Sequence, residues 1–116
     1  MTFTQQTDSY NQRRYGKPWI ARLNFSTPSK PIYEFGNWLG QQGDEGELSI
    51  EIQPGDVVAT GQKDLRKGRG GADAIGVVQH DGSVVWGFTP AKARDAGKVV
   101  RETPQVAEFD LLALGM

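Results

Sequence analysis

The sequence predicts a mainly β protein: a compact antiparallel β-barrel or curled sheet of five or six short strands with one short helix. Three observations favour this class. Glycine supplies 15 of the 116 residues, about twice the usual ~7%, which favours turns and short strands over long helices. Apolar and polar residues alternate with a period of two in several segments. Turn dipeptides, Pro54-Gly55 and Asp81-Gly82, separate those segments.

The length corresponds to one domain, since the chain has 116 residues and 12.7 kDa. Residues 1–9 are polar around a single Phe3 and have no period. We therefore expect a flexible N-terminal tail over residues 1–9 and a single β-rich domain over residues 10–116.

The first half of the domain contains two predicted strands and a long loop. Residues 19–25 alternate strictly, which predicts a half-buried strand with Ile20, Arg22 and Asn24 facing away from the core. Its inward side chains are then Trp19, Ala21, Leu23 and Phe25. Two prolines interrupt residues 26–31, and residues 32–35 form a short aromatic strand that ends at Gly36. Residues 36–46 contain four glycines and are predicted to be a long hairpin loop.

Residues 47–53 show the clearest alternation, with Leu48, Ile50 and Ile52 pointing inward. Pro54-Gly55 is suited to a type II turn, in which the glycine supplies a positive φ. Residues 56–60 then form the next strand. The composition of residues 62–73, charged and rich in glycine without a period, predicts a loop.

Residues 75–88 predict a hairpin around Asp81-Gly82, a dipeptide typical of the two-residue type I′ turn. That turn would pair Val77 with Trp86 and place both side chains in the core. A short helix follows, with Thr89 as N-cap, Pro90 as first residue and Gly97 as its stop. Residues 99–100 are expected to form a closing strand, and residues 106–114 fit a helix and a strand equally well.

Several function classes are excluded by what the sequence lacks. It has no cysteine, one histidine, and no Gly-x-Ser-x-Gly or calcium-loop pattern. We therefore expect a protein that is not an enzyme, with no catalytic residues, metal or cofactor. No apolar run approaches ~18 residues and the N-terminus has no apolar h-region, which predicts a cytoplasmic protein without a membrane partner.

Two basic segments are the predicted binding residues for a phosphate-rich ligand, either nucleic acid or a nucleotide. Arginine forks match phosphate oxygens, and glycines let backbone N–H groups approach an anion. An isoelectric point near 5.8 argues against a general nucleic-acid binder but allows a local basic surface. The predicted ligand-binding residues, in segments 10–19 and 61–71, are Arg13, Arg14, Lys17, Lys63, Arg66, Lys67 and Arg69. In the first segment these residues are interleaved with aromatic ones, as stacking of unpaired bases requires.

The alternative function is inhibition of a protein partner, such as a host protein or a defence complex. Large apolar side chains in a glycine-rich loop either fold back onto the sheet or anchor a partner. Acidic residues beside them could imitate the charge of nucleic acid. The partner-binding residues under this hypothesis are Tyr10, Trp38, Leu39, Asp44 and Glu45.

Three strings, YNQRRYGKPWIA (residues 10–21), PGDVVATGQKD (residues 54–64) and GVVQHDGSV (residues 76–84), resemble small uncharacterised proteins encoded by bacteriophages and prophages. The resemblance covers residues 10–95 and transfers no functional residues. It implies a viral origin and action in the cytoplasm of an infected bacterium. Small accessory phage proteins often act by binding, so the resemblance favours a non-enzymatic binding module.

Overall fold

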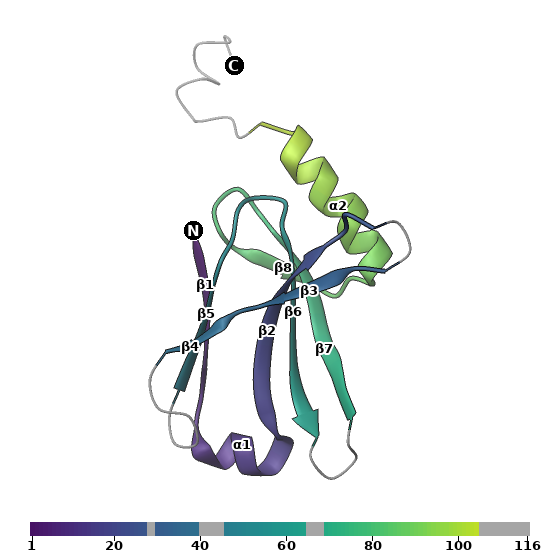
Figure 1. Cartoon of the computed structure of the whole chain (residues 1–116). Coiled ribbons are helices and arrows are strands. Elements are labelled where there is room, and N and C mark those ends of the chain that lie inside the picture. The colour runs from purple at the N-terminus through teal and green to yellow at the C-terminus, as the bar shows by residue number, and fades with distance from the viewer. Residues whose placement is uncertain (28–29, 40–45, 65–68, 105–116) are drawn as a thin grey trace.

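The computed structural model describes residues 1–27, 30–39, 46–64 and 69–104 of the chain (Figure 1). These residues form eight strands in two antiparallel sheets, together with two helices. The strands are β1 (Thr2–Thr7), β2 (Lys17–Asn24), β3 (Ile32–Phe35), β4 (Asn37–Leu39), β5 (Gly46–Glu51), β6 (Val57–Asp64), β7 (Arg69–Val78) and β8 (Val84–Trp86). The helices are α1 (Ser9–Tyr15) and α2 (Pro90–Glu102). The predicted mainly β class is confirmed, with more strands than the sequence indicated.

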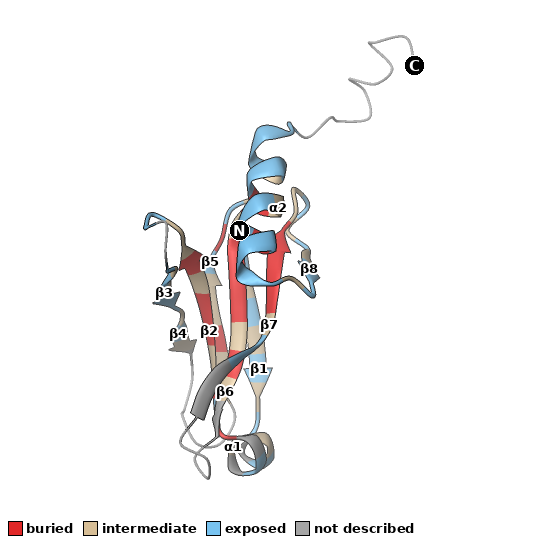
Figure 2. Cartoon of the chain, turned by 90° about the vertical axis from the view of Figure 1, so that its right-hand side faces the viewer, coloured by how far each residue is buried: buried red, intermediate tan, exposed pale blue. Residues whose placement is uncertain are grey.

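The two sheets have the strand orders β3-β2-β6-β7-β8 and β1-β5-β4, and neither closes into a barrel. One face of the five-stranded sheet packs against α2, and Ala93 of that helix joins Leu23, Val57 and Val77 in a buried cluster. A second buried cluster on the opposite face contains Ile52, Val58 and Val78, with side chains of β1 and β5 packed against it. Figure 2 shows the buried residues concentrated on β2, β6 and β7.

The expected N-terminal tail is wrong, because residues 2–7 form β1 and pair with β5 over its whole length. Phe3 lies opposite Ile50 and packs against the second cluster, and its ring centre is 5.8 Å from that of Trp86. Exposed and half-buried residues alternate along β1, which lies at a sheet edge, and all of them except Phe3 are polar. A polar edge strand has a weak apolar period, which is why the sequence predicted a tail.

The predicted loop over residues 36–46 begins instead with strand β4, which pairs with β5, while residues 40–45 lie outside the described part. Gly36 is the corner between β3, which pairs with β2, and β4, which pairs with β5 in the other sheet. A Cβ at Gly36 would lie 2.7 Å from the carbonyl oxygen of Ser49 and 2.8 Å from Cγ1 of Ile20. The two sheets therefore approach so closely here that only glycine fits.

The strand predicted at residues 19–25 is confirmed as β2, and its inward face contacts the first cluster as expected. The opposite face was expected to be open, yet Ile20 is only 1% exposed. Because β4 and β5 cover this face, Ile20 is buried between the sheets.

The loop predicted at residues 62–73 is wrong at both ends, since β6 continues to Asp64 and β7 begins at Arg69, while residues 65–68 lie outside the described part. The register runs from Val57 opposite Val77 to Asp64 opposite Arg69, with one irregularity between Thr60 and Gly61. In residues 62–64 and 69–73, glycine and charge therefore accompany a strand pair rather than a loop. Strands β6 and β7 pair here although their residues show no regular alternation of apolar and polar side chains.

The Pro54-Gly55 turn is confirmed. The Asp56 amide donates to the carbonyl of Gln53 over 3.0 Å, and Gly55 has a φ of +89°, as the third residue of a type II turn requires. Gly55 also donates its amide to Val78 over 2.8 Å, and its carbonyl accepts a 2.8 Å hydrogen bond from Arg101. The turn is therefore fixed to both β7 and α2.

The type I′ turn predicted at Asp81-Gly82 is wrong. Gly82 has a φ of +88°, but Asp81 does not share the positive φ that type I′ requires. The amide of Gly82 donates to Gln79 and that of Gln79 to Ser83, which defines a three-residue loop. The longer loop shifts the register by one residue, so Trp86 lies opposite Gly76 rather than Val77. Val77 is buried as predicted, whereas Trp86 is 40% exposed.

The predicted start of the final helix is confirmed, because the Thr89 hydroxyl caps α2 and Pro90 is its first residue. The predicted stop at Gly97 and the strand at residues 99–100 are wrong, since α2 continues to Glu102. Gly97 is buried because the α2 backbone crosses Gly55 there, and a Cβ would meet the carbonyl oxygen of Gly55. Residues 106–114 lie outside the described part. Within the described residues, neither helix is long and apolar enough to cross a membrane.

The β7–β8 loop supports a prediction about pH. The Ser83 hydroxyl donates to the Asp81 carboxylate over 2.6 Å and the Ser83 amide over 2.9 Å, and these bonds lower the pKa of Asp81. A lowered folded-state pKa stabilises the protein above the unfolded value, about 3.9, and this contribution is lost as the pH falls through the folded value. We expect Ser83→Ala to raise the pKa of Asp81, measured by NMR titration of its carboxyl carbon. The backbone amide bond remains in this variant, so an unchanged pKa would contradict the hydrogen bond from the Ser83 hydroxyl.

Candidate functional site

The two predicted basic segments meet at one end of the molecule, which we call the basic end: α1, the start of β2, the end of β6 and the start of β7 (Figure 1). In the β2–β6 pair, Lys17 lies directly opposite Lys63. In the next pair, Arg69 lies opposite Asp64. Helix α1, which contains Arg13 and Arg14, contacts both β2 and β6. Strands and a helix from segments more than forty residues apart in the sequence therefore lie side by side at this end.

Local sequence explains why α1 forms and ends where it does. The Asp8 carboxylate accepts a 2.8 Å hydrogen bond from the Asn11 amide and caps the first turn. Gly16 ends the helix with a φ of +96°, and the chain then turns into β2. The Gly16 carbonyl accepts a hydrogen bond from the side chain of Gln62, 3.4 Å away, which ties this turn to β6.

The side chains of Tyr10 and Arg14 on α1 are exposed. Tyr10 is 58% exposed, and its hydroxyl accepts a 3.3 Å hydrogen bond from Arg14. Of the other predicted ligand-binding residues, Arg66 and Lys67 lie outside the described part, as do Asp44 and Glu45 of the alternative hypothesis.

Trp38 and Leu39 are strand residues rather than a loop tip. Trp38 pairs with Leu48 and Leu39 with Glu47, and Trp38 is half-buried. The Nζ of Lys17 lies 5.8 Å from the centre of the Trp38 ring, within range of a cation–π contact. Trp38 thus folds back onto the sheet beside the basic end.

An aromatic cluster next to Lys17 was not predicted as a site. Trp19 on β2 lies edge-on to two rings of β3, with ring centres 5.9 Å from Tyr33 and 5.6 Å from Phe35. Tyr33 and Phe35 lie 6.3 Å apart, and Phe35 is 63% exposed. The alternation of Tyr33 and Phe35 in the sequence is the signal that puts them on one face. Their position beside Trp19 depends on the β2–β3 register, which the sequence does not specify.

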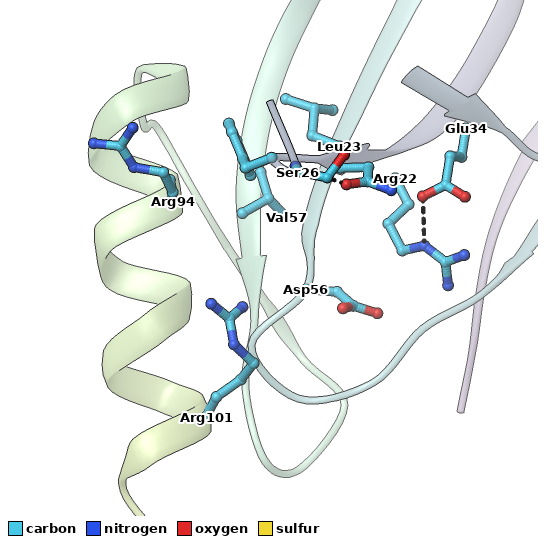
Figure 3. Close-up of a pocket in the computed structure, with 10 residues that line it drawn as sticks. Arg22, Leu23, Ser26, Glu34, Asp56, Val57, Arg94 and Arg101 are labelled. Atoms are coloured by element: carbon cyan, nitrogen blue, oxygen red, sulfur yellow. Dashed lines mark hydrogen bonds and ion pairs between the residues drawn. The ribbon is translucent and has the colours of Figure 1, made fainter. Parts of the chain in front are cut away.

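A pocket of about 510 Å³ lies at the other end of the molecule, between α2, the end of β2 and the β5–β6 turn (Figure 3). Its charged lining comprises Arg22, Glu34, Asp56, Arg94 and Arg101.

The charged groups of this pocket already have partners within the fold. Arg22 forms an ion pair with Glu34 at 3.6 Å. Asp56 accepts a 2.7 Å hydrogen bond from the Gln53 amide, and Arg101 donates to Gly55. Asp56 and Arg101 therefore stabilise the turn and its contact with α2, and the Arg22–Glu34 pair joins β2 to β3.

In the part of the chain that the structure describes, no group of three or more His, Cys, Asp or Glu side chains could hold a metal ion. The single histidine, His80, lies 2.6 Å from the carbonyl oxygen of Thr103 through its Nε2 and so connects the β7–β8 loop to the end of α2. Comparison of the chain with protein-family models, with curated proteins and with solved structures found no significant match.

Proposed function

We propose that the protein is a non-enzymatic binding module that engages a phosphate-rich ligand, nucleic acid or a nucleotide, at the basic end. The observation that carries this proposal is the pairing of Lys17 with Lys63 beside the arginine-bearing helix α1. This register brings two basic residues that are distant in the sequence to one place in the sheet. A phosphate bound there would be attracted by their charges and would release its counterions.

The distribution of charge supports this position. Residues 10–22 contain four basic residues and no acidic one, and residues 63–69 contain four basic residues and one acidic residue. The fold joins these two segments through the β2–β6 and β6–β7 pairs. This backbone arrangement supports a local cationic surface on a chain whose net charge is −1.

The test is charge reversal at the paired lysines. We expect the double variant Lys17→Glu, Lys63→Glu to lose binding of a thymidine oligonucleotide at least about tenfold. The dependence of log affinity on log salt should also flatten by about 0.7 for each single-strand phosphate that the variant no longer neutralises. Fluorescence anisotropy at several salt concentrations measures both quantities, with a nucleoside triphosphate as a competitor to detect nucleotide binding.

The matched control is Lys92→Glu, Lys98→Glu, which changes the net charge equally on exposed positions of α2, at the far end of the molecule. This control should leave the affinity close to that of the original protein, and circular dichroism should show that both variants stay folded. Equal losses in the two variants would mean that only the net charge matters. An unchanged affinity in the Lys17, Lys63 variant would overturn the proposed function.

A further inference from the structure

We propose that unpaired bases of a single-stranded nucleic acid stack on the aromatic cluster of Trp19, Tyr33 and Phe35. The inference rests on the proposed function and specifies its ligand, since a cluster of this kind selects a single strand over a duplex or an isolated phosphate. The basic end would hold the sugar–phosphate backbone, and the cluster would hold the bases.

The geometry of the cluster suits stacking. Tyr33 lies opposite Leu23 and Phe35 opposite Ala21, so both rings share a face with Trp19. Trp19 contacts each of them edge-on, with interplanar angles of 68° and 80°. Tyr33 and Phe35 are tilted by only 33° from each other. The three rings thus pack against one another across the β2–β3 pair.

Phe35 is the most exposed large apolar side chain of the described residues, at 63%. Helix α2 covers another part of the same sheet face through Ala93, Ala96 and Val100. The cluster lies on β2 and β3, which is the edge strand of the sheet. The fold therefore leaves an aromatic surface in solvent, where it contributes little to the core.

Charge beside the cluster identifies the occupant. Lys17 precedes Trp19 by two residues in β2, about 7 Å along the strand, and its Nζ lies near the Trp38 ring of β4. Lys63 lies opposite Lys17. Cationic groups that continue into stacked aromatic rings form the usual surface for single strands, because a cationic groove follows the backbone while rings accept any base. Bases in a duplex are already stacked on their neighbours and do not offer a free face.

The test compares two variants of the same strand. Phe35→Ala should weaken binding of a thymidine oligonucleotide of about 12 nucleotides by about 5- to 150-fold, the range for losing one stacked base. The salt dependence should stay unchanged, because every phosphate contact is kept. Ile32→Ala is the matched control: Ile32 is 50% exposed on β3, and its odd spacing from Phe35 places it on the opposite face. It should bind as the original protein does.

A second variant, Phe35→Leu, keeps apolar bulk but removes the ring, so a loss of affinity in this variant cannot be attributed to unfolding. Thermal melts of all three variants check the fold. A uridine oligonucleotide in the same assay distinguishes RNA from DNA as the preferred strand.

An abasic oligonucleotide of the same length separates failure of this inference from failure of the proposed function. If bases stack on the cluster, the abasic strand must bind more weakly than the thymidine strand. A duplex must also bind more weakly than both the thymidine and the uridine oligonucleotides. If the abasic strand binds equally well and Phe35→Ala has no effect, the inference is overturned while the phosphate-binding function stands. If no strand binds, with or without bases, the proposed function itself fails.

Discussion

Replacing Ile20 with alanine is expected to lower the free energy of unfolding by about 2–5 kcal/mol. Ile20 is a residue of β2 and is 1% exposed. Its side chain packs against the corner at Gly36, and its Cγ1 would lie 2.8 Å from a Cβ built on that glycine. Truncation removes buried methyl groups from a place where the two sheets already touch. Because the backbone cannot close the gap easily, a cavity remains and adds to the lost transfer free energy.

Denaturant unfolding of the Ile20→Ala variant measures this loss, and Ile32→Ala serves as the comparison. Both changes remove the same atoms from a β-strand, but Ile32 is 50% exposed. We expect the Ile32 variant to lose less than about 1 kcal/mol, as for most surface substitutions. Similar losses in the two variants would mean that the three-stranded sheet does not cover Ile20.

Much of the local structure follows from sequence. The alternation of residues 19–25 and 47–53 predicts β2 and β5 with the correct inward side chains Leu23, Leu48 and Ile52. Pro54-Gly55 predicts the turn between β5 and β6, and Thr89-Pro90 predicts the start of α2. In each case a single residue type or a short period determines the backbone within a few residues.

The hairpin at Asp81-Gly82 shows where local signals become ambiguous. The same dipeptide fits a two-residue type I′ loop and the last two positions of a three-residue loop with glycine at the positive φ. Only the second leaves Asp81 with a negative φ, which suits a residue with a side chain. The choice changes the register by one residue and moves Trp86 to the other face.

In helix α2, Gly97 has a structural role that differs from the one its sequence context predicted. Glycine usually ends a helix, yet Gly97 lies inside α2 because another backbone passes close to it. That contact joins residues 55 and 97, and no local pattern in either segment reports it. The same is true of β1 and β4, whose pairing with β5 supplies the order that their own sequences lack.

The candidate site was predictable in composition but not in arrangement. Clustered arginines and lysines identified both basic segments, whereas their meeting depends on the register that sets Lys17 opposite Lys63. The aromatic cluster combines Trp19, expected in the core, with rings of a neighbouring strand. A period of two tells which residues share a face of one strand, and only the pairing of strands tells which faces adjoin.

The second large effect is expected at the turn on which α2 rests. Gly55→Ala should lower the free energy of unfolding by about 2–5 kcal/mol, from two causes. The φ of +89° is unfavourable for a side chain by about 1–2 kcal/mol. The added Cβ would also lie 2.8 Å from the carbonyl oxygen of Gly97 and would displace the side chain of Arg101. Overpacking of this kind typically costs about 1–3 kcal/mol.

Gly87→Ala separates these two causes. Gly87 has a φ of +102°, yet a Cβ there would meet nothing within 4 Å. This variant should therefore show only the conformational penalty, about 1–2 kcal/mol. The difference between the two variants in denaturant melts measures the close packing of α2 against the turn. Arg101→Ala in the Gly55→Ala background should recover part of the loss if displacement of the Arg101 side chain contributes. Equal destabilisation by Gly55→Ala and Gly87→Ala would contradict the close contact between Gly97 and Gly55. If α2 did not pack against the turn, the methyl group added at residue 55 would meet no backbone atom of the helix.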